Sequence, residues 1–178
     1  MSRIGIFFGT DTGRTRRIAK LIAQRLGAAA ATPTNINRVG AADLAPFPAL
    51  ILGTPTLGEG ELPGVPSGAQ TAGWLEFLPQ LEQQDWTGKT VAIYGLGDQE
   101  KYPDQFVDAI ALLYDAVSAR GARMVGDTAI EGYRFTASKA AVDGRFLGLA
   151  LDQINQPTLT EGRVDAWLDA IVPLLTAG

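Results

Sequence analysis

The sequence predicts an α/β protein with a doubly wound, five-stranded parallel sheet and helices on both of its faces. Strand-like apolar runs alternate along the chain with amphipathic helical patterns, and this alternation indicates parallel β-α-β units. The three strongest runs are continuously apolar, which is typical of strands that are buried on both faces. They cover residues 3–9, 48–53 and 90–96.

The remaining elements are predicted from weaker patterns. A short edge strand is expected at residues 35–39, and a further weak strand near 122–126. The segment 127–148 fits no simple β-α unit, so we interpret it as an insertion that interrupts the fifth strand, which resumes at 149–151. Helices with one apolar face are expected at 14–27, 73–83, 103–120 and 161–175.

Composition restricts the possible functions. The length of 178 residues predicts a single domain, 1–178. The chain has no Cys and no His, which excludes Cys/His zinc sites, thiol nucleophiles, iron–sulfur ligation, disulfides and proton transfer by His. Any redox chemistry must therefore be carried by a bound organic cofactor. No apolar run is long enough to span a membrane and no signal peptide follows Met1, so we expect a cytoplasmic protein.

Acidic and basic residues are unevenly distributed along the chain. The net charge is −4, yet residues 1–40 hold seven basic side chains and one acidic side chain. Later in the chain, Glu59, Glu61, Asp98 and Asp104 lie in predicted loops. These acids either act through their electrostatic field or form ordinary solvated surface. Nothing in the sequence resembles a nucleic-acid-binding patch.

The first predicted strand runs directly into a hydroxyl-rich loop, and a helical pattern follows at once. Such a loop points free backbone N–H groups and the positive end of a helix in one direction, which favours an anion. It lacks the Lys of a Walker A loop and the three glycines of a dinucleotide fingerprint, so it suits one terminal phosphate monoester. Alternatively, Asp11 or Thr12 is only a helix cap. The loop consists of Thr10, Asp11, Thr12, Gly13, Arg14 and Thr15.

Two further loops are expected at the same edge of the sheet. Right-handed crossovers bring the carboxyl ends of parallel strands together, and ligands bind where the strand order reverses. The loops Thr54–Gly68 and Gly97–Pro103 therefore converge on Thr10–Thr15. Tyr102 precedes a proline and is held extended. Its ring either stacks on a planar heterocycle or packs as the lead-in to the next helix.

The most specific motifs of the chain are Thr10–Thr15, Leu52–Pro63, Gly95–Gln99 and Val142–Gln156. With these motifs and an interrupted fifth strand, the chain resembles the long-chain flavodoxins, and more narrowly the flavodoxins of nitrogen-fixing bacteria. The resemblance covers nearly the whole chain. It implies the strand order 2-1-3-4-5, with FMN bound where that order reverses.

The resemblance also implies roles for individual residues. The six residues Thr10 through Thr15 would hold the FMN phosphate with amides and hydroxyls. One face of the flavin would be lined by Thr56, Leu57 and Gly58, and the other by Gly97, Asp98 and Tyr102. Many flavodoxins have Trp where this chain has Leu57, which leaves Tyr102 as the one clear stacking ring. Trp74 is not expected to replace that Trp, because it belongs to the apolar stripe of a helix.

The chemistry implied by the resemblance is one-electron transfer at low potential. The Gly58 carbonyl can turn toward the flavin N5–H and favour the neutral semiquinone, since Gly tolerates such a backbone flip. Glu59, Glu61 and Asp98, with apolar Leu57 against the ring, would disfavour the anionic hydroquinone. We expect these charges to lower the second reduction potential by something on the order of 100 mV.

By resemblance, the chain is a low-potential FMN-containing electron carrier, not an enzyme, that donates single electrons from its semiquinone/hydroquinone couple. The expected acceptor is the nitrogenase iron protein and the expected donor is an upstream reductase. We expect a monomer with no membrane or nucleic-acid partner. An FMN-dependent NAD(P)H:quinone or flavin reductase is an alternative, but it would need room over the flavin for NAD(P)H and substrate. A response-regulator-like module would need a phosphoacceptor Asp where Gly53-Thr54 stands.

Overall fold

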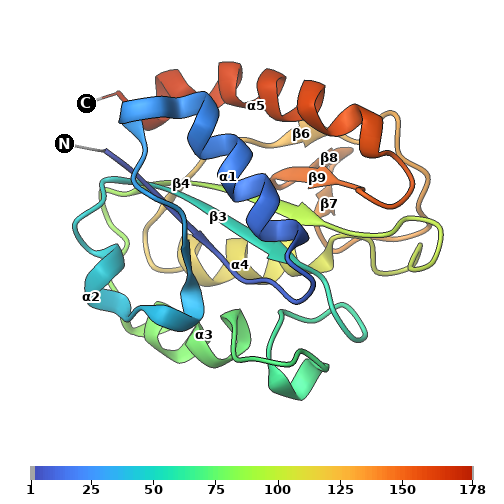
Figure 1. Cartoon of the computed structure of the whole chain (residues 1–178), viewed down its shortest axis with the longest axis horizontal. Helices are drawn as coiled ribbons and strands as arrows, with labels where there is room; N and C mark the ends of the chain where they lie inside the picture. Colours follow the sequence, from blue (N-terminus) through green and yellow to red (C-terminus); the bar gives the residue numbers. More distant parts are fainter. Residues whose placement is uncertain (1–2, 178) are drawn as a thin grey trace.

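A computed structural model describes residues 3–177 of the chain. It shows a twisted parallel sheet between two layers of helices (Figure 1). The hydrogen-bonded order is β2-β1-β3-β4-β5, and a further strand, β9, also pairs with β4. This is the predicted order 2-1-3-4-5. The strands of this sheet are β1 (Ile4–Phe8), β2 (Thr34–Asn35), β3 (Ala49–Pro55), β4 (Thr90–Leu96), β5 (Arg123–Met124) and β9 (Leu149–Leu151).

The fifth position of the sheet is filled by two separate strands. β5 pairs in parallel with the start of β4, at Thr90 and Val91, and β9 pairs in parallel with its end, from Tyr94 to Leu96. The intervening segment forms a small antiparallel sheet of order β6-β8-β7. Its strands are β6 (Thr128–Ala129), β7 (Ala141–Val142) and β8 (Arg145–Phe146). The predicted interruption of the fifth strand is therefore confirmed.

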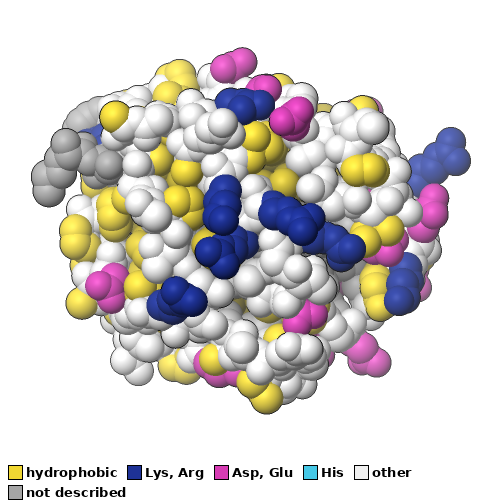
Figure 2. Space-filling view, in the orientation of Figure 1, with side chains coloured by type: hydrophobic (Ala, Val, Ile, Leu, Met, Phe, Trp, Pro, Cys, Tyr) yellow, Lys and Arg dark blue, Asp and Glu magenta, His cyan; other side chains and the backbone are white. Residues whose placement is uncertain are grey.

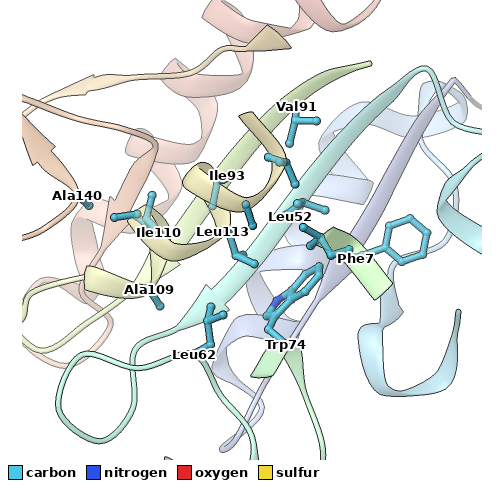
Figure 3. Packing of buried hydrophobic residues seen from close by; sticks show 14 of the residues in the cluster. Phe7, Leu52, Leu62, Trp74, Val91, Ile93, Ala109, Ile110, Leu113 and Ala140 are labelled. Carbon is cyan, nitrogen blue, oxygen red and sulfur yellow. The ribbon is translucent and has the colours of Figure 1, made fainter. Parts of the chain in front are cut away.

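The helices cover both faces of the main sheet, as predicted. α1 and α5 pack on one face through Ile18, Ile22 and Trp167, while α3 and α4 pack on the other. Figure 3 shows Trp74, Leu62 and Leu52 among the buried side chains of this second face. Among the described residues, no helix is long and apolar enough to cross a membrane. The helices are α1 (Arg14–Leu26), α2 (Ala41–Leu44), α3 (Trp74–Gln83), α4 (Asp108–Ser118) and α5 (Thr160–Leu175), with 3-10 turns at Gly27–Ala29, Ile36–Arg38, Val65–Ser67 and Pro157–Leu159.

The second strand differs from the prediction. It ends at Asn35, and the residues expected to continue it form a 3-10 turn, Ile36–Arg38. The cause is local, because the Asn35 side chain accepts a hydrogen bond from the amide of Asn37 at 3.1 Å and turns the chain. The expectation of a strand over residues 35–39 is therefore wrong beyond its first residue.

The third predicted helix begins five residues later than expected. α4 starts at Asp108, and Val107 before it has a positive φ of 50°. The amide of Phe106 donates instead to Ala137 of the inserted segment at 3.3 Å. The Phe106 ring packs against Phe135 and Phe146 of that segment, with centroids 5.6 and 5.9 Å apart. Packing of the insertion against Phe106 thus delays the start of α4.

Candidate functional site

The three predicted loops meet around one cavity at the carboxyl ends of β1, β3 and β4. Its volume is about 420 Å³, within the usual range for small-molecule sites. A smaller recess of about 110 Å³ adjoins it and is shared by Thr56, Leu57, Tyr102 and their neighbours. The lining of the larger cavity is Asp11, Thr12, Arg14, Thr15, Pro55, Thr56, Leu57, Leu96, Gly97, Asp98, Lys101, Tyr102, Gln153 and Ile154.

The hydroxyl-rich loop forms one end of this cavity, directly before α1. Thr10 and Gly13 of the predicted set do not line the cavity but shape the loop. The Gly13 amide donates to Thr10 Oγ1 at 3.0 Å, and Gly13 has a φ of 89°, which favours glycine. From strand β4, the Tyr94 hydroxyl donates to the Thr15 carbonyl at 2.9 Å. Burial raises the pKa of Tyr94, so this hydroxyl keeps its proton.

The second loop forms a tight hairpin beside the cavity. Leu57 and Glu61 exchange two backbone hydrogen bonds of 2.9 and 2.7 Å. Gly58 and Gly60 have φ values of 54° and 88° at the tip. A Cβ on Gly60 would lie 2.7 Å from Asp108 Oδ2, so the hairpin rests directly on the first turn of α4. Gly58 itself is exposed and lines only the smaller recess.

The third loop provides the opposite wall. Tyr102 is 47% exposed at the rim of the cavity. The Asp98 carboxylate is used within the loop, because its Oδ1 accepts hydrogen bonds from the Lys101 amide at 3.0 Å and from Asn155 Nδ2 at 2.8 Å. Asp98 therefore holds the loop in place in addition to lining the cavity. Leu57 is half-buried and lines the cavity with Tyr102.

A fourth segment, residues 152–155, completes the cavity and was missed by the sequence analysis. Its Gln153 and Ile154 line the cavity, and Ile154 is 48% exposed. The available signal was its position after β9, since this strand resumes the fifth position and ends at the same edge of the sheet. Residues 149–151 were expected to resume the fifth strand, but no site residue was predicted in the loop after them.

Asp152 anchors this fourth segment to the third loop. Its side chain is fully buried and accepts five hydrogen bonds of 2.8–3.0 Å from backbone and side-chain N–H groups of Gln99, Ile154 and Asn155. Burial raises the pKa of this carboxyl, but hydrogen bonds from Asn155 and Gln99 outweigh burial and lower the pKa below its ordinary value. Asp152 is therefore ionised near neutral pH and fixes two walls of the cavity to each other.

The pKa of Asp108 is shifted in the opposite direction, above its ordinary value. The residue is 2% exposed, and burial raises its pKa even though the amide and the charge of Lys139 lower it. Its Oδ1 accepts the Lys139 amide at 2.8 Å. The neighbouring Ala109 amide donates to Thr56 Oγ1 at 3.1 Å. The start of α4 thus connects the hairpin, the cavity wall and the inserted segment.

Trp74 lies away from the cavity, as expected. It is fully buried in the α3 layer, where its Nε1 donates to the Gly53 carbonyl at 2.8 Å. A larger hollow, of about 520 Å³, lies between the insertion and α5. Arg145 and Arg163 in its lining already pair with Asp127 and with the Tyr133 ring, respectively. The converging loops therefore mark the candidate site.

Comparisons with known proteins identify relatives of the chain. A family model described as Flavodoxin matches residues 6–167. A flavodoxin of Klebsiella pneumoniae is 53% identical over 171 residues, which cover 96% of this chain and 97% of that protein. Flavodoxin 1 of Escherichia coli (strain K12) is 44% identical over 172 residues, with coverage of 96% and 93%. The solved structure of Fusobacterium nucleatum flavodoxin bound to flavin mononucleotide has a TM-score of 0.86 at 36% identity, and covers 97% of this chain and 98% of that one.

Proposed function

The chain belongs to the flavodoxin family, and from this premise we propose that it delivers single electrons at low potential to the nitrogenase iron protein. Flavodoxins are electron-transfer proteins rather than enzymes, and they carry their electrons on FMN. The chain is accordingly an FMN-binding electron carrier. The proposal concerns the residues that hold the cofactor, the low potential and the partners.

The cavity fits FMN in its chemistry. One end combines the Thr12 hydroxyl, the Arg14 guanidinium and the start of α1, all of which favour a phosphate. The walls present apolar Leu57 and the aromatic ring of Tyr102, which suit a planar heterocycle. When bound, FMN supplies the capacity to accept and release one electron at a time.

The protein's own residues would bind and shield this group. The loop Thr10–Thr15 would hold the phosphate, with Thr10 keeping the Gly13 amide in position. Thr56, Leu57 and Gly58 would form one wall, and Gly97, Asp98 and Tyr102 the other. The observation that supports the proposal is that these three loops line one cavity, with the hydroxyl-rich loop at one end and Leu57 and Tyr102 in its walls.

A comparison of two ligands tests the phosphate end. Thr12→Ala should weaken binding of FMN to the apoprotein about tenfold, as expected for one lost hydrogen bond to a charged group. Riboflavin has the same ring system without the phosphate, so its affinity should stay unchanged in the variant. Equal loss for both ligands, measured by quenching of flavin fluorescence, would show that Thr12 does not contact the phosphate.

The low potential is proposed to come from acids next to the cavity. Glu59 and Glu61 are exposed on the hairpin, and neither forms an ion pair in residues 3–177. Glu59→Gln with Glu61→Gln should raise the lower of the two one-electron potentials by something on the order of 100 mV. The exposed pair Glu131→Gln and Asp169→Asn is a charge-matched control away from the cavity. An equal shift in both double variants would reject the local electrostatic effect.

The partners are proposed from the resemblance to flavodoxins of nitrogen-fixing bacteria. The acidic hairpin beside the cavity supports docking to a basic partner face, and we propose an upstream reductase as the donor. We also propose a cytoplasmic, single-domain monomer. Electron transfer from the reduced protein to purified nitrogenase iron protein tests the acceptor, with other low-potential acceptors as controls across ionic strength. Turnover no faster than with the controls would remove the iron protein as the acceptor.

A further inference from the structure

A cluster of basic side chains lies on α1, and only one of them, Arg14, lines the proposed cofactor site. We define the α1 cationic surface as Arg14, Arg16, Arg17 and Lys20, all of which are exposed. Figure 2 shows Lys and Arg side chains gathered over α1 near the middle of that face. The α1 sequence contains no acidic residue. A cluster of positive charges on an otherwise acidic chain marks a candidate interaction surface.

The positive charges of this surface are not neutralised within the molecule. In the part of the chain that the structure describes, none of the four side chains forms an ion pair. Arg25, one turn beyond the surface, behaves differently and pairs with Asp165 at 2.9 Å and with Glu161 at 3.6 Å. Asp11 is the one acid of residues 1–40 and lies in the loop before α1. The surface therefore keeps a local excess of positive charge.

The location connects this charge to electron transfer. Arg14 lines the cavity while the other three side chains continue along the helix away from it. A protein docked on the α1 cationic surface therefore also covers the cavity edge. Charges beyond about 8 Å are largely screened at physiological ionic strength, so a docked partner responds to this surface more than to the net charge of −4.

We propose that the α1 cationic surface docks an acidic face of a redox protein partner, an inference that rests on the proposed electron-carrier function. This partner face is opposite in charge to the one that the Glu59 and Glu61 hairpin would accept. A protein is favoured over an anionic membrane because the exposed side chains of α1 are charged or polar and offer no apolar group for insertion. A nucleic-acid partner is disfavoured because the surface is one short helix on a chain of net charge −4.

The sign of the salt dependence tests the proposal with the holoprotein. Two haem proteins serve as probes, acidic cytochrome b5 and basic cytochrome c, each reduced by the protein in stopped-flow experiments. Ionic strength is varied from about 0.01 M to about 1 M, which shortens the Debye length from roughly 30 Å to 3 Å. A carrier governed by its net charge would reduce cytochrome b5 faster as salt increases. Docking on the α1 cationic surface predicts the reverse, a rate that falls as salt increases.

Matched variants locate the effect. Arg16→Gln, Arg17→Gln and Lys20→Gln together should slow reduction of cytochrome b5 about tenfold at low salt and reverse its salt dependence. Arg14 is left unchanged because it lines the cavity. The control removes the same number and kind of charges elsewhere. It combines Arg38→Gln, Arg123→Gln and Arg134→Gln, all at exposed positions outside the cavity lining, and it should react like the unmodified protein.

Three outcomes would overturn the proposal. The first is a rate of cytochrome b5 reduction that rises with salt in the unmodified protein. The second is an equal loss of that rate in both triple variants. The third is sedimentation of the protein with anionic phosphatidylglycerol vesicles that is abolished in the α1 triple variant. The last result would assign the surface to a membrane. Failure of the proposed function is distinguishable, because a protein that bound no FMN would reduce neither cytochrome. Visible spectra of both triple variants verify that they are folded and loaded.

Discussion

Replacement of Asp152 by Asn should destabilise the protein far more than its conservative chemistry suggests. Asp152 Oδ2 accepts three hydrogen bonds, from the Gln99 amide, Gln99 Nε2 and Asn155 Nδ2. Its Oδ1 accepts two more, from the amides of Ile154 and Asn155. The carboxamide of Asn has one oxygen, so in either orientation its NH2 group faces at least two donors that lose their acceptor.

The structure sets the magnitude of this loss. Each buried donor left without an acceptor costs about 1–3 kcal/mol, so two of them give about 2–6 kcal/mol. We expect a decrease of about 3–4 kcal/mol in the free energy of unfolding, a large part of the roughly 5–15 kcal/mol typical of a domain. Asp165→Asn is the matched control, because it removes an exposed ion pair with Arg25 and should cost less than about 1 kcal/mol.

Urea unfolding of the apoprotein at pH 7, followed by circular dichroism, measures both variants. The difference between the Asp152 variant and the unmodified protein should narrow as pH falls below the ordinary Asp value of 3.8. Its pKa is lowered in the folded state, so its stabilisation is present above the unfolded pKa and is lost as pH falls through the folded one. A loss no larger than that of the control would refute the reasoning.

Three further substitutions probe the support of the cavity. Tyr94→Phe removes the donor to the Thr15 carbonyl and should lower the apoprotein's free energy of unfolding by about 1–2 kcal/mol; an unchanged urea midpoint would contradict this. Gly60→Ala combines a φ of 88° with a 2.7 Å contact to Asp108, so FMN binding should weaken tenfold or more by fluorescence titration. Its control Gly144→Ala has a φ of 78° in open space and should cost about 1–2 kcal/mol of stability with no change in FMN affinity. Asp108→Asn should flatten the pH dependence of stability just above pH 3.8, because a raised folded pKa makes stability fall as pH rises from the unfolded pKa through the folded one; an unchanged slope would assign that dependence to other groups.

Local sequence patterns predicted the sheet well. The runs that became β1, β3 and β4 are continuously apolar, and each is buried almost throughout in the structure. The order of the strands was obtained from the resemblance, whereas the split of the fifth strand was inferred from a segment that fitted no β-α unit. β2 was misplaced because the Asn35 side chain competes with the ladder for the Asn37 amide, an effect that strand periodicity does not report.

The cavity was predicted in outline because parallel strands bring their carboxyl ends together. All three expected loops line it. The location of the fourth segment follows from the end of β9, but its anchoring was not predictable from the residues alone, since the Asp152 carboxylate takes two of its donors from Gln99, 53 residues earlier in the chain. Periodicity and turn chemistry describe neighbours in sequence. A buried acid whose partners are distant in sequence gives no such pattern.

Because sequence patterns do not show which side chains pair in space, the positive charge of α1 is visible in the sequence but its role is not. Seven basic residues in the first forty gave the bias, but their use depends on which side chains are paired. The structure separates Arg25, neutralised by α5, from the four cations of the α1 cationic surface. A carrier must receive an electron from one protein and pass it to another. In the proposed docking scheme, an acidic hairpin and a basic helix at the edge of one cavity would give the two partners surfaces of opposite sign, so that selection between them rests on charge.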